Sequence, residues 1–159
     1  MTETTAVKSS AQVCRPAGID DLAVIEKVDN AVFTDKPYPY FVLRQLFDVH
    51  GEHCVVAEAD GVVHGYALVA LEPNHSTAWL LSLAVLPGSR KHGFGRALMD
   101  RVLAMCVDAG VDRMRITVRP TNDVAYGLYK ASGFDWVHAE PTYFGEGEAR
   151  DVLEKRFKR

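Results

Sequence analysis

The sequence has neither a long apolar run nor a sustained excess of basic charge. No apolar stretch approaches the roughly 20 residues that a transmembrane helix requires, and residues 1–10 contain no apolar segment of the kind found in signal peptides. The formal net charge of -3 over 159 residues argues against a nucleic acid or a membrane surface as a partner. We therefore expect a disordered tail over residues 1–10, a single domain over residues 11–159, and neither nucleic acid nor membrane among the partners.

Cysteine is scarce as well. Cys14, Cys54 and Cys106 lie far apart, and neither a C-x-x-C pair nor a cluster of histidines accompanies them. An odd number of widely spaced cysteines does not make the framework of a disulfide-stabilised protein, and it offers no metal site. We expect a reduced, cytoplasmic protein that holds no metal.

The most informative segment that is present runs from an apolar stretch into a basic, glycine-containing turn and then into a helix. The apolar stretch ends near Val85, and the turn contains Gly93 and Gly95. Because glycine has no Cβ, the backbone N–H groups of such a turn can converge on an anion, and the start of the next helix adds further free N–H groups. The segment predicts a binding site for a ligand that carries phosphate groups.

Two other glycine motifs do not fit this turn. A dinucleotide-binding fingerprint requires a third glycine where the chain has Leu98. A nucleotide P-loop requires Lys and then Ser or Thr after the second glycine, whereas Arg96 and Ala97 follow Gly95. Taken alone, the motif also fits a turn that merely connects a strand to a helix.

A second segment follows the glycine turn at the spacing that the family motifs have. It consists of Asn122 to Tyr129 and then Ser132 to Phe134. Together with Arg90-x-x-Gly93-x-Gly95 it resembles the GCN5-related N-acetyltransferase (GNAT) superfamily, whose acetyl-CoA signature is Q/R-x-x-G-x-G/A. The resemblance is specific over about residues 80–144 and coarse over the first 75 residues. It implies a single-domain α/β (α+β) fold, with a mixed, mostly antiparallel sheet of about seven strands flanked by about four helices.

The pattern of apolar residues and turn signals agrees with this fold. Alternation and glycine or proline breaks predict the order β-α-α-β-β-β-α-β-α-β-β. The expected strands are residues 12–15, 53–59, 62–71, 77–86, 113–119, 134–144 and 150–157, and the expected helices are residues 20–33, 40–49, 95–109 and 122–130.

The resemblance implies acetyl-CoA as co-substrate and direct attack by an amine, without an acyl-enzyme. Backbone groups of Leu83 and Val85 would pair with the pantetheine arm, an N–H near Leu83 would polarise the thioester carbonyl, and the amides of residues 90–96 would hold the pyrophosphate. Tyr129 would protonate the departing thiolate as general acid. The implied cofactor-binding residues are Leu83, Ala84, Val85, Arg90, Lys91, His92, Gly93, Phe94, Gly95, Arg96, Asn122 and Tyr129.

Two of these residues have a structural alternative. Tyr129 is spaced from Tyr126 as a core tyrosine of an amphipathic helix would be. Asn122 suits the N-cap of the same helix, a role that is compatible with contact to the cofactor.

The general base is missing from its familiar positions. Many relatives carry a glutamate where this chain has Trp79, and ribosomal-protein alanine acetyltransferases carry one where it has Thr117. The remaining candidates near strand ends are Glu72, His75, His138 and Glu140, and a chain of water molecules is a further option.

The acceptor is left open between a small molecule and a peptide or protein, in each case with a primary amine. An aromatic pocket is one option, formed by Tyr38, Tyr40, Phe41, Tyr143 and Phe144, although ordinary packing explains these residues as well. The alternatives to the acetyltransferase are a CoA-binding sensor without catalysis and a transferase for a longer acyl group. Relatives are often homodimers, but no residue here indicates one.

Overall fold

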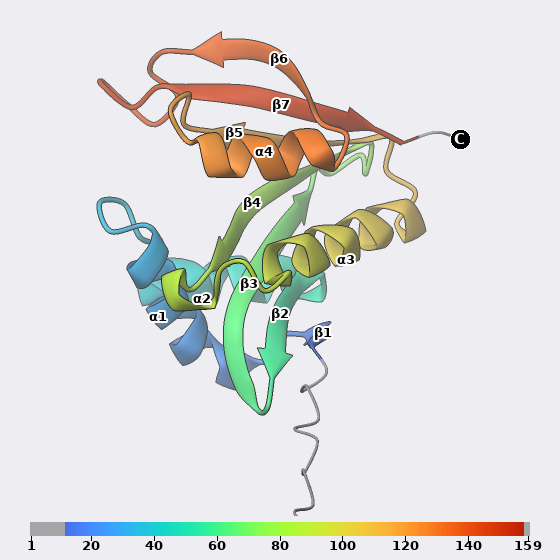
Figure 1. Cartoon of the computed structure of the whole chain (residues 1–159). Coiled ribbons are helices and arrows are strands. Elements are labelled where there is room, and N and C mark those ends of the chain that lie inside the picture. The colour runs from blue at the N-terminus through green and yellow to red at the C-terminus, as the bar shows by residue number, and fades with distance from the viewer. Residues whose placement is uncertain (1–11, 158–159) are drawn as a thin grey trace, which may run out of the picture.

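The computed structural model describes residues 12–157, so the expected tail over residues 1–10 lies outside the described residues. The chain forms the eleven elements in the expected order (Figure 1). The strands are β1 (Val13–Pro16), β2 (Cys54–Ala59), β3 (Val62–Leu71), β4 (Thr77–Val85), β5 (Arg113–Val118), β6 (Asp135–Glu140) and β7 (Arg150–Arg156), and the helices are α1 (Leu22–Val32), α2 (Tyr40–His50), α3 (Phe94–Asp108) and α4 (Asp123–Ala131).

All seven strands belong to one sheet in the order β1-β2-β3-β4-β5-β7-β6. Every neighbouring pair is antiparallel except β4 and β5, which are parallel and are joined through α3. The β2–β3 hairpin turns at Asp60 and Gly61, whose φ angles of 53° and 74° suit a two-residue turn of the primed type. The mixed, mostly antiparallel sheet and its four helices confirm the predicted fold class.

The strand predicted over residues 134–144 is shorter in the structure, because β6 ends at Glu140. Pro141 follows directly and has no N–H to donate to the ladder. The chain then turns, and the N–H of Phe144 donates to the carbonyl of Glu148 at 3.2 Å. The segment between β6 and β7 is therefore a loop whose side chains are free to face the rest of the molecule.

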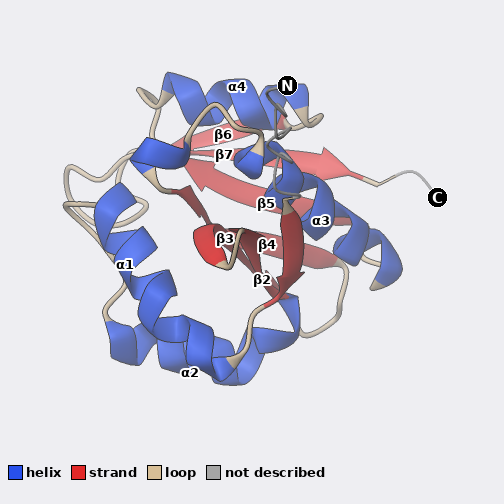
Figure 2. Ribbon diagram, turned by 60° about the horizontal axis from the view of Figure 1, so that its bottom comes forward, coloured by secondary structure: helices blue, strands red, loops and turns tan. Residues whose placement is uncertain are grey.

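The helices cover the sheet in two groups, each with its own apolar cluster (Figure 2). Leu22, Ile25 and Val28 of α1 pack with Val56 and Leu68 of the sheet. On the other side α3 packs through an apolar stripe that belongs to a cluster shared with α4, and the stripe consists of Phe94, Leu98, Met99, Val102 and Cys106. No helix of residues 12–157 is long and apolar enough to cross a membrane.

The sheet opens between β4 and β5. Their parallel pairing begins at Thr77 and Arg113 and stops at Leu80 and Ile116, although β4 continues to Val85. At the same point β4 carries an extra residue, Leu81, because Leu80 and Ser82 pair with consecutive residues of β3. A bulge of this kind bends a strand and increases its twist. The two strands diverge from here on, which leaves one edge of β4 without a partner strand.

Candidate functional site

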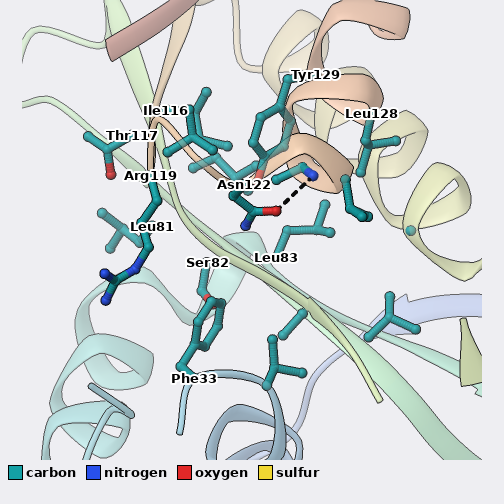
Figure 3. Close-up of a pocket in the computed structure, with 18 of the residues that line it drawn as sticks. Phe33, Leu81, Ser82, Leu83, Ile116, Thr117, Arg119, Asn122, Leu128 and Tyr129 are labelled. Carbon is teal, nitrogen blue, oxygen red and sulfur yellow. Dashed lines mark hydrogen bonds between the residues drawn. The ribbon is translucent and has the colours of Figure 1, made fainter. Parts of the chain in front are cut away.

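A cavity of about 1000 Å³ fills the space where β4 and β5 diverge (Figure 3). One wall is β4 from Leu80 to Val85, and the opposite wall is the end of β5 with the start of α4. The glycine turn closes one end, and the segments between α1 and α2 and between β6 and β7 border the other. The cavity therefore has two ends made from different parts of the chain.

Most residues predicted to bind the cofactor line this cavity. Two of the predicted residues are not among the lining residues: His92 borders a second, smaller cavity beside His64, and Arg96 directs its guanidinium to Asp100 at 3.2 Å. The residues that do line the main cavity are Leu83, Ala84, Val85, Arg90, Lys91, Gly93, Phe94, Gly95, Asn122 and Tyr129.

The glycine turn has the geometry of an anion site. Lys91 and Gly93 have φ angles of 66° and 83°, and Gly93 is the N-cap of α3. The first backbone donor of the helix is Ala97, which donates to the Gly93 carbonyl at 3.0 Å, so the N–H groups of residues 94–96 precede the helical ladder. These free donors and the positive end of the helix dipole suit a phosphate group.

The basic side chains of the turn are available to the same ligand. Neither Arg90 nor Lys91 forms a salt bridge or a side-chain hydrogen bond with any other residue in the described part of the chain. By contrast, Arg96 is engaged with Asp100 on the next turn of α3. Two unpaired cations beside free N–H groups fit a pyrophosphate.

The divergence of β4 and β5 leaves backbone groups of β4 available to a ligand. Beyond Leu80, the backbone groups of β4 that face β5 have no strand partner, and they border the cavity as far as Val85. An extended chain with amide groups, such as the pantetheine arm, can pair with this edge as an added strand does. The side chains of Leu83 and Val85 pack against the apolar cluster that α3 and α4 share, and their backbone remains beside the cavity.

Tyr129 of α4 lines the cavity above Asn122 and is 7% exposed (Figure 3). Its ring packs against Phe134 at 6.0 Å between centroids, so the expected core role is also present. The Tyr129 hydroxyl has no hydrogen-bond partner among the described residues. Within residues 12–157, every side-chain N or O atom that is fully buried has such a partner. The Tyr129 hydroxyl is therefore not fully buried and opens to the cavity. Burial raises the pKa of Tyr129, which keeps the phenol protonated at neutral pH.

Asn122 caps α4 as predicted. Its Oδ1 accepts the N–H of Ala125 at 3.1 Å. The side-chain amide nitrogen is not used by the cap, and the residue lines the cavity near Leu83 and Tyr129 (Figure 3). The cap fixes the position of the amide group at the cavity wall.

None of the four candidates for a general base borders the cavity. Glu72 accepts a hydrogen bond from Trp79 Nε1 at 3.0 Å, and His75 lies in the β3–β4 turn. Both are at the opposite end of β4 from the cavity, because β4 borders the cavity only from Leu80 onward. His138 and Glu140 bond each other at 2.9 Å on β6, an edge strand. The expectation that these strand ends border the cleft is wrong.

The aromatic residues proposed for the acceptor pocket divide into two groups. Tyr38 and Phe144 line the cavity, and Tyr143 packs edge-on against Phe144 at 4.8 Å. Tyr40 and Phe41 lie on α2 with exposures of 42% and 68%, and they do not line it. The interpretation of these two residues as pocket residues is wrong, because α2 turns this face to solvent.

A charged network at the acceptor end was not predicted. Glu148, in the loop before β7, lies 3.4 Å from Arg119, 3.3 Å from Arg150 and 3.7 Å from Lys36. Arg119 also bonds Asp35 at 2.5 Å. These residues come from three segments far apart in the sequence, so no local motif could have indicated them. Four members of the network, together with Phe33, form the polar and aromatic border of the cavity, whereas Glu148 is not a lining residue and holds three of them in place. The four members are Asp35, Lys36, Arg119 and Arg150.

The site offers no arrangement for metal chemistry. Within residues 12–157, no group of three or more His, Cys, Asp or Glu side chains is placed to hold a metal ion. What the site does offer is an anion cradle, an unpaired strand edge and a protonated phenol around one cavity. That combination can hold a phosphate-bearing thioester and protonate its leaving group.

The comparisons with known proteins agree with this chemistry. Residues 19–134 match the model of the acetyltransferase (GNAT) family. An N-alpha-acetyltransferase of Sulfolobus acidocaldarius is 28% identical, over 93% of this chain and 94% of its own length. Among solved structures, Ard1 from Thermoplasma volcanium superposes with a TM-score of 0.87 at 23% identity, over 94% of this chain and 99% of the other.

A further structure carries information about a bound ligand. Naa50 of Arabidopsis thaliana, solved in complex with the bisubstrate analogue CoA-Ac-MVNAL, has a TM-score of 0.79 at 21% identity and covers 92% of this chain and 99% of its own. The family match spans most of the chain and includes both the glycine turn and the Asn122–Tyr129 segment. The chain therefore belongs to the GNAT family and is an acetyltransferase that uses acetyl-CoA.

Proposed function

We propose that this enzyme transfers an acetyl group from acetyl-CoA directly to a primary amine, the α-amino group at the N-terminus of a peptide or protein. The observation that carries the proposal is the two-ended cavity at the divergence of β4 and β5. A thioester that enters from the glycine turn and an amine that enters from the other end would meet beside Leu83 and Tyr129.

Most of the predicted residues that line the cavity have a role in this proposal. The N–H groups of residues 94–96, with Arg90 and Lys91, hold the pyrophosphate. The unpaired edge of β4 at Leu83 and Val85 aligns the pantetheine arm, and a backbone N–H near Leu83 stabilises negative charge on the carbonyl oxygen. Tyr129 donates its proton to the departing thiolate. No side chain of the described residues needs to become acetylated.

The choice of an α-amino group is supported by the relatives and by the acceptor end. The relative from Sulfolobus acidocaldarius is an N-alpha-acetyltransferase that matches over nearly its whole length, and the Naa50 ligand joins CoA to a peptide. The border of the cavity combines aromatic rings with the carboxylate of Asp35, and Glu148 pairs with Arg119 directly behind this border. Such groups suit an extended peptide carrying an amine. We also propose a cytoplasmic location, because Cys54 and Cys106 are buried free thiols.

The test is a rate comparison with acetyl-CoA and paired acceptors. Thiol release is measured with a library of short peptides that carry a free N-terminus, with the same peptides blocked by formylation, and with a panel of small diamines and amino acids. We expect thiol release with some free peptides, none with their formylated forms, and an increase of one acetyl mass on the N-terminal residue. Faster release with a small amine than with every peptide would overturn the choice of acceptor.

A further inference from the structure

A buried carboxyl group lies next to the cavity and has no role in the chemistry above. Asp29 of α1 is 0% exposed. Its Oδ1 accepts the hydroxyl of Tyr66 at 2.5 Å, and its Oδ2 accepts the backbone N–H of Tyr38 at 2.6 Å. A buried carboxyl group is costly to keep unless it is bonded in this way, so its presence requires an explanation.

A second hydrogen bond connects this group to the cavity. Tyr66 is fully buried, and its hydroxyl lies 2.9 Å from Ser82 Oγ as well as 2.5 Å from Asp29. A phenol has one proton, so when Tyr66 donates to the Asp29 carboxylate, the Ser82 hydroxyl must donate to Tyr66. The chain Ser82–Tyr66–Asp29 is then ordered in one direction, from the cavity to the buried carboxylate.

The bulge in β4 places Ser82 at the start of this chain. The extra residue Leu81 changes the alternation of the strand, so that Leu81 packs with the α1–α2 cluster and Ser82 also faces Tyr66 on that side. Ser82 lines the cavity and directly precedes Leu83, beside which the proposed reaction takes place (Figure 3). Its oxygen retains lone pairs that can accept a proton from the cavity.

We propose that Ser82, Tyr66 and Asp29 form a proton relay that supplies the missing general base. As the C–N bond forms and the C–S bond breaks, the amine nitrogen gives a proton to Ser82 Oγ. The Ser82 proton passes to the Tyr66 oxygen, and the Tyr66 proton passes to Asp29 Oδ1. The thiolate takes a proton from Tyr129. After product release Asp29 returns its proton along the same chain, and Tyr129 regains one from solvent.

The surroundings of Asp29 set the pH dependence that this relay predicts. The titratable groups that face it are the phenols of Tyr66 on β3 and Tyr38 before α2, and β4 contributes only the Ser82 hydroxyl. No Lys, Arg or His in the described chain forms an ion pair with Asp29. Burial therefore raises the pKa of Asp29 above its usual range. The relay works only when Asp29 is ionised, so kcat/KM should fall as the pH drops through this raised pKa.

The experiment measures kcat/KM against pH for the wild type, Asp29→Asn, Tyr66→Phe, Ser82→Ala and the double variant Asp29→Asn with Tyr66→Phe. We expect each single change to cost about 10²-fold on the plateau, which is typical of a lost general base. The acid limb should disappear in Asp29→Asn. Because the residues act as one unit, the loss of kcat/KM in the double variant should be no larger than the loss in its less active single variant.

Three readouts separate the relay from a structural role. Affinity for acetyl-CoA should stay within twofold of wild type. Asp29→Asn should keep or raise Tm at pH 7. Because the pKa of Asp29 is raised in the folded state, its carboxyl group contributes less to the stability of the fold as the pH rises through that pKa. An amide carries no charge, so the variant does not lose stability in this way. Tyr126→Phe is the matched control. The Tyr126 hydroxyl donates to Asp151 outside the cavity, so the dependence of kcat/KM on pH in this variant should match that of the wild type.

The relay rests on the proposed transfer to an amine, and the two can fail separately. An active wild type whose variants keep its rate and its acid limb would overturn the relay alone, as would a double variant whose losses multiply. A wild type that binds acetyl-CoA but releases no thiol with any amine would overturn both. Ser82→Ala removes a single oxygen at the cavity wall, from a residue that is 6% exposed, so it tests the relay even if a change at Asp29 prevents folding.

Discussion

The two ends of the cavity are built in different ways. The cofactor end consists mainly of backbone groups from two continuous segments, residues 83–96 and 122–129, which are fixed by a strand edge, a positive-φ turn and two helix starts. The acceptor end consists of side chains from the segment before α2, the end of β5 and the loop before β7. Backbone groups suit the binding of acetyl-CoA, the substrate that relatives share. Side chains on loops can differ between enzymes that use different acceptors.

The largest effect should come from the residue where the two ends meet. Tyr129→Phe removes the proposed proton donor but keeps the ring that packs on Phe134. We expect kcat to fall by about 10²-fold or more while the Kd for acetyl-CoA is nearly unchanged. Stopped-flow thiol release and calorimetry measure the two quantities. Tyr126→Phe on the same helix is the control, and equal rates in all three proteins would remove Tyr129 from the mechanism.

The cofactor end alone should respond to a change in the glycine turn. Gly93 has a φ of 83°, and a Cβ added there would meet no atom closer than 3.9 Å, so the cost of Gly93→Ala is backbone strain rather than a clash. Strain of roughly 1–2 kcal/mol corresponds to about a tenfold weaker Kd for acetyl-CoA if the turn relaxes away from its binding geometry.

Gly88→Ala provides the matched control for this change. Gly88 lies in the same connection, has no positive φ and also has open space around an added Cβ. Its variant should bind acetyl-CoA as wild type does. If both variants bind equally well in calorimetric titrations, the conformation of Gly93 is not needed for the cradle.

A third variant separates the two roles of Asn122. Asn122→Ala should lower the free energy of unfolding by about 1 kcal/mol, because the cap on Ala125 N–H is lost. Asn122→Ser can restore the cap without restoring an amide. If the Ser variant regains stability in urea titrations but still binds acetyl-CoA weakly, the amide contacts the cofactor. Full recovery of both would mean that Asn122 is only a cap.

The smallest effect should come from the acceptor end. Glu148→Gln weakens partly exposed ion pairs with Arg119, Arg150 and Lys36, each worth no more than about 1 kcal/mol. We expect KM for the peptide to rise a few-fold and the Kd for acetyl-CoA to stay constant.

Glu154→Gln is the control for the acceptor end. Glu154 is also surrounded by arginines, among them Arg115 at 2.9 Å, but none of its partners lines the cavity, whereas all three partners of Glu148 do. Initial rates over a range of peptide concentrations should therefore match wild type. A Glu148 variant with unchanged KM would mean that the charged network does not order the acceptor end.

The same contrast explains what could be predicted from the sequence. The Asp60-Gly61 turn, the Asn122 cap and the glycine turn are local, because each is fixed by neighbouring residues, and all three have the expected conformation. The predicted end of β6 is wrong, because Pro141 stops the ladder within a segment of strand-like residues. The four base candidates are wrong for another reason, because the sequence does not show which strand ends border the cavity. Glu72 and His75 lie at the far end of β4, and His138 and Glu140 lie on the edge strand β6.

The Asp29 network could not have been found from a pattern. Asp29, Tyr66 and Ser82 lie on three elements, and only the β4 bulge turns Ser82 toward Tyr66. A single Asp on the apolar face of a helix gives no indication of its partners. Contacts of this kind depend on the packing of α1 on the sheet, which is a tertiary property.

A crystal structure of the enzyme with CoA tests the proposed binding mode most directly. We predict that the pantetheine amides lie about 2.9 Å from backbone groups of Leu83 and Val85, in hydrogen-bond geometry. We also predict that the pyrophosphate lies on the N–H groups of residues 94–96 and that the sulfur lies next to the Tyr129 hydroxyl. CoA bound outside the gap between β4 and β5, for example in the smaller cavity beside His64, would contradict this binding mode.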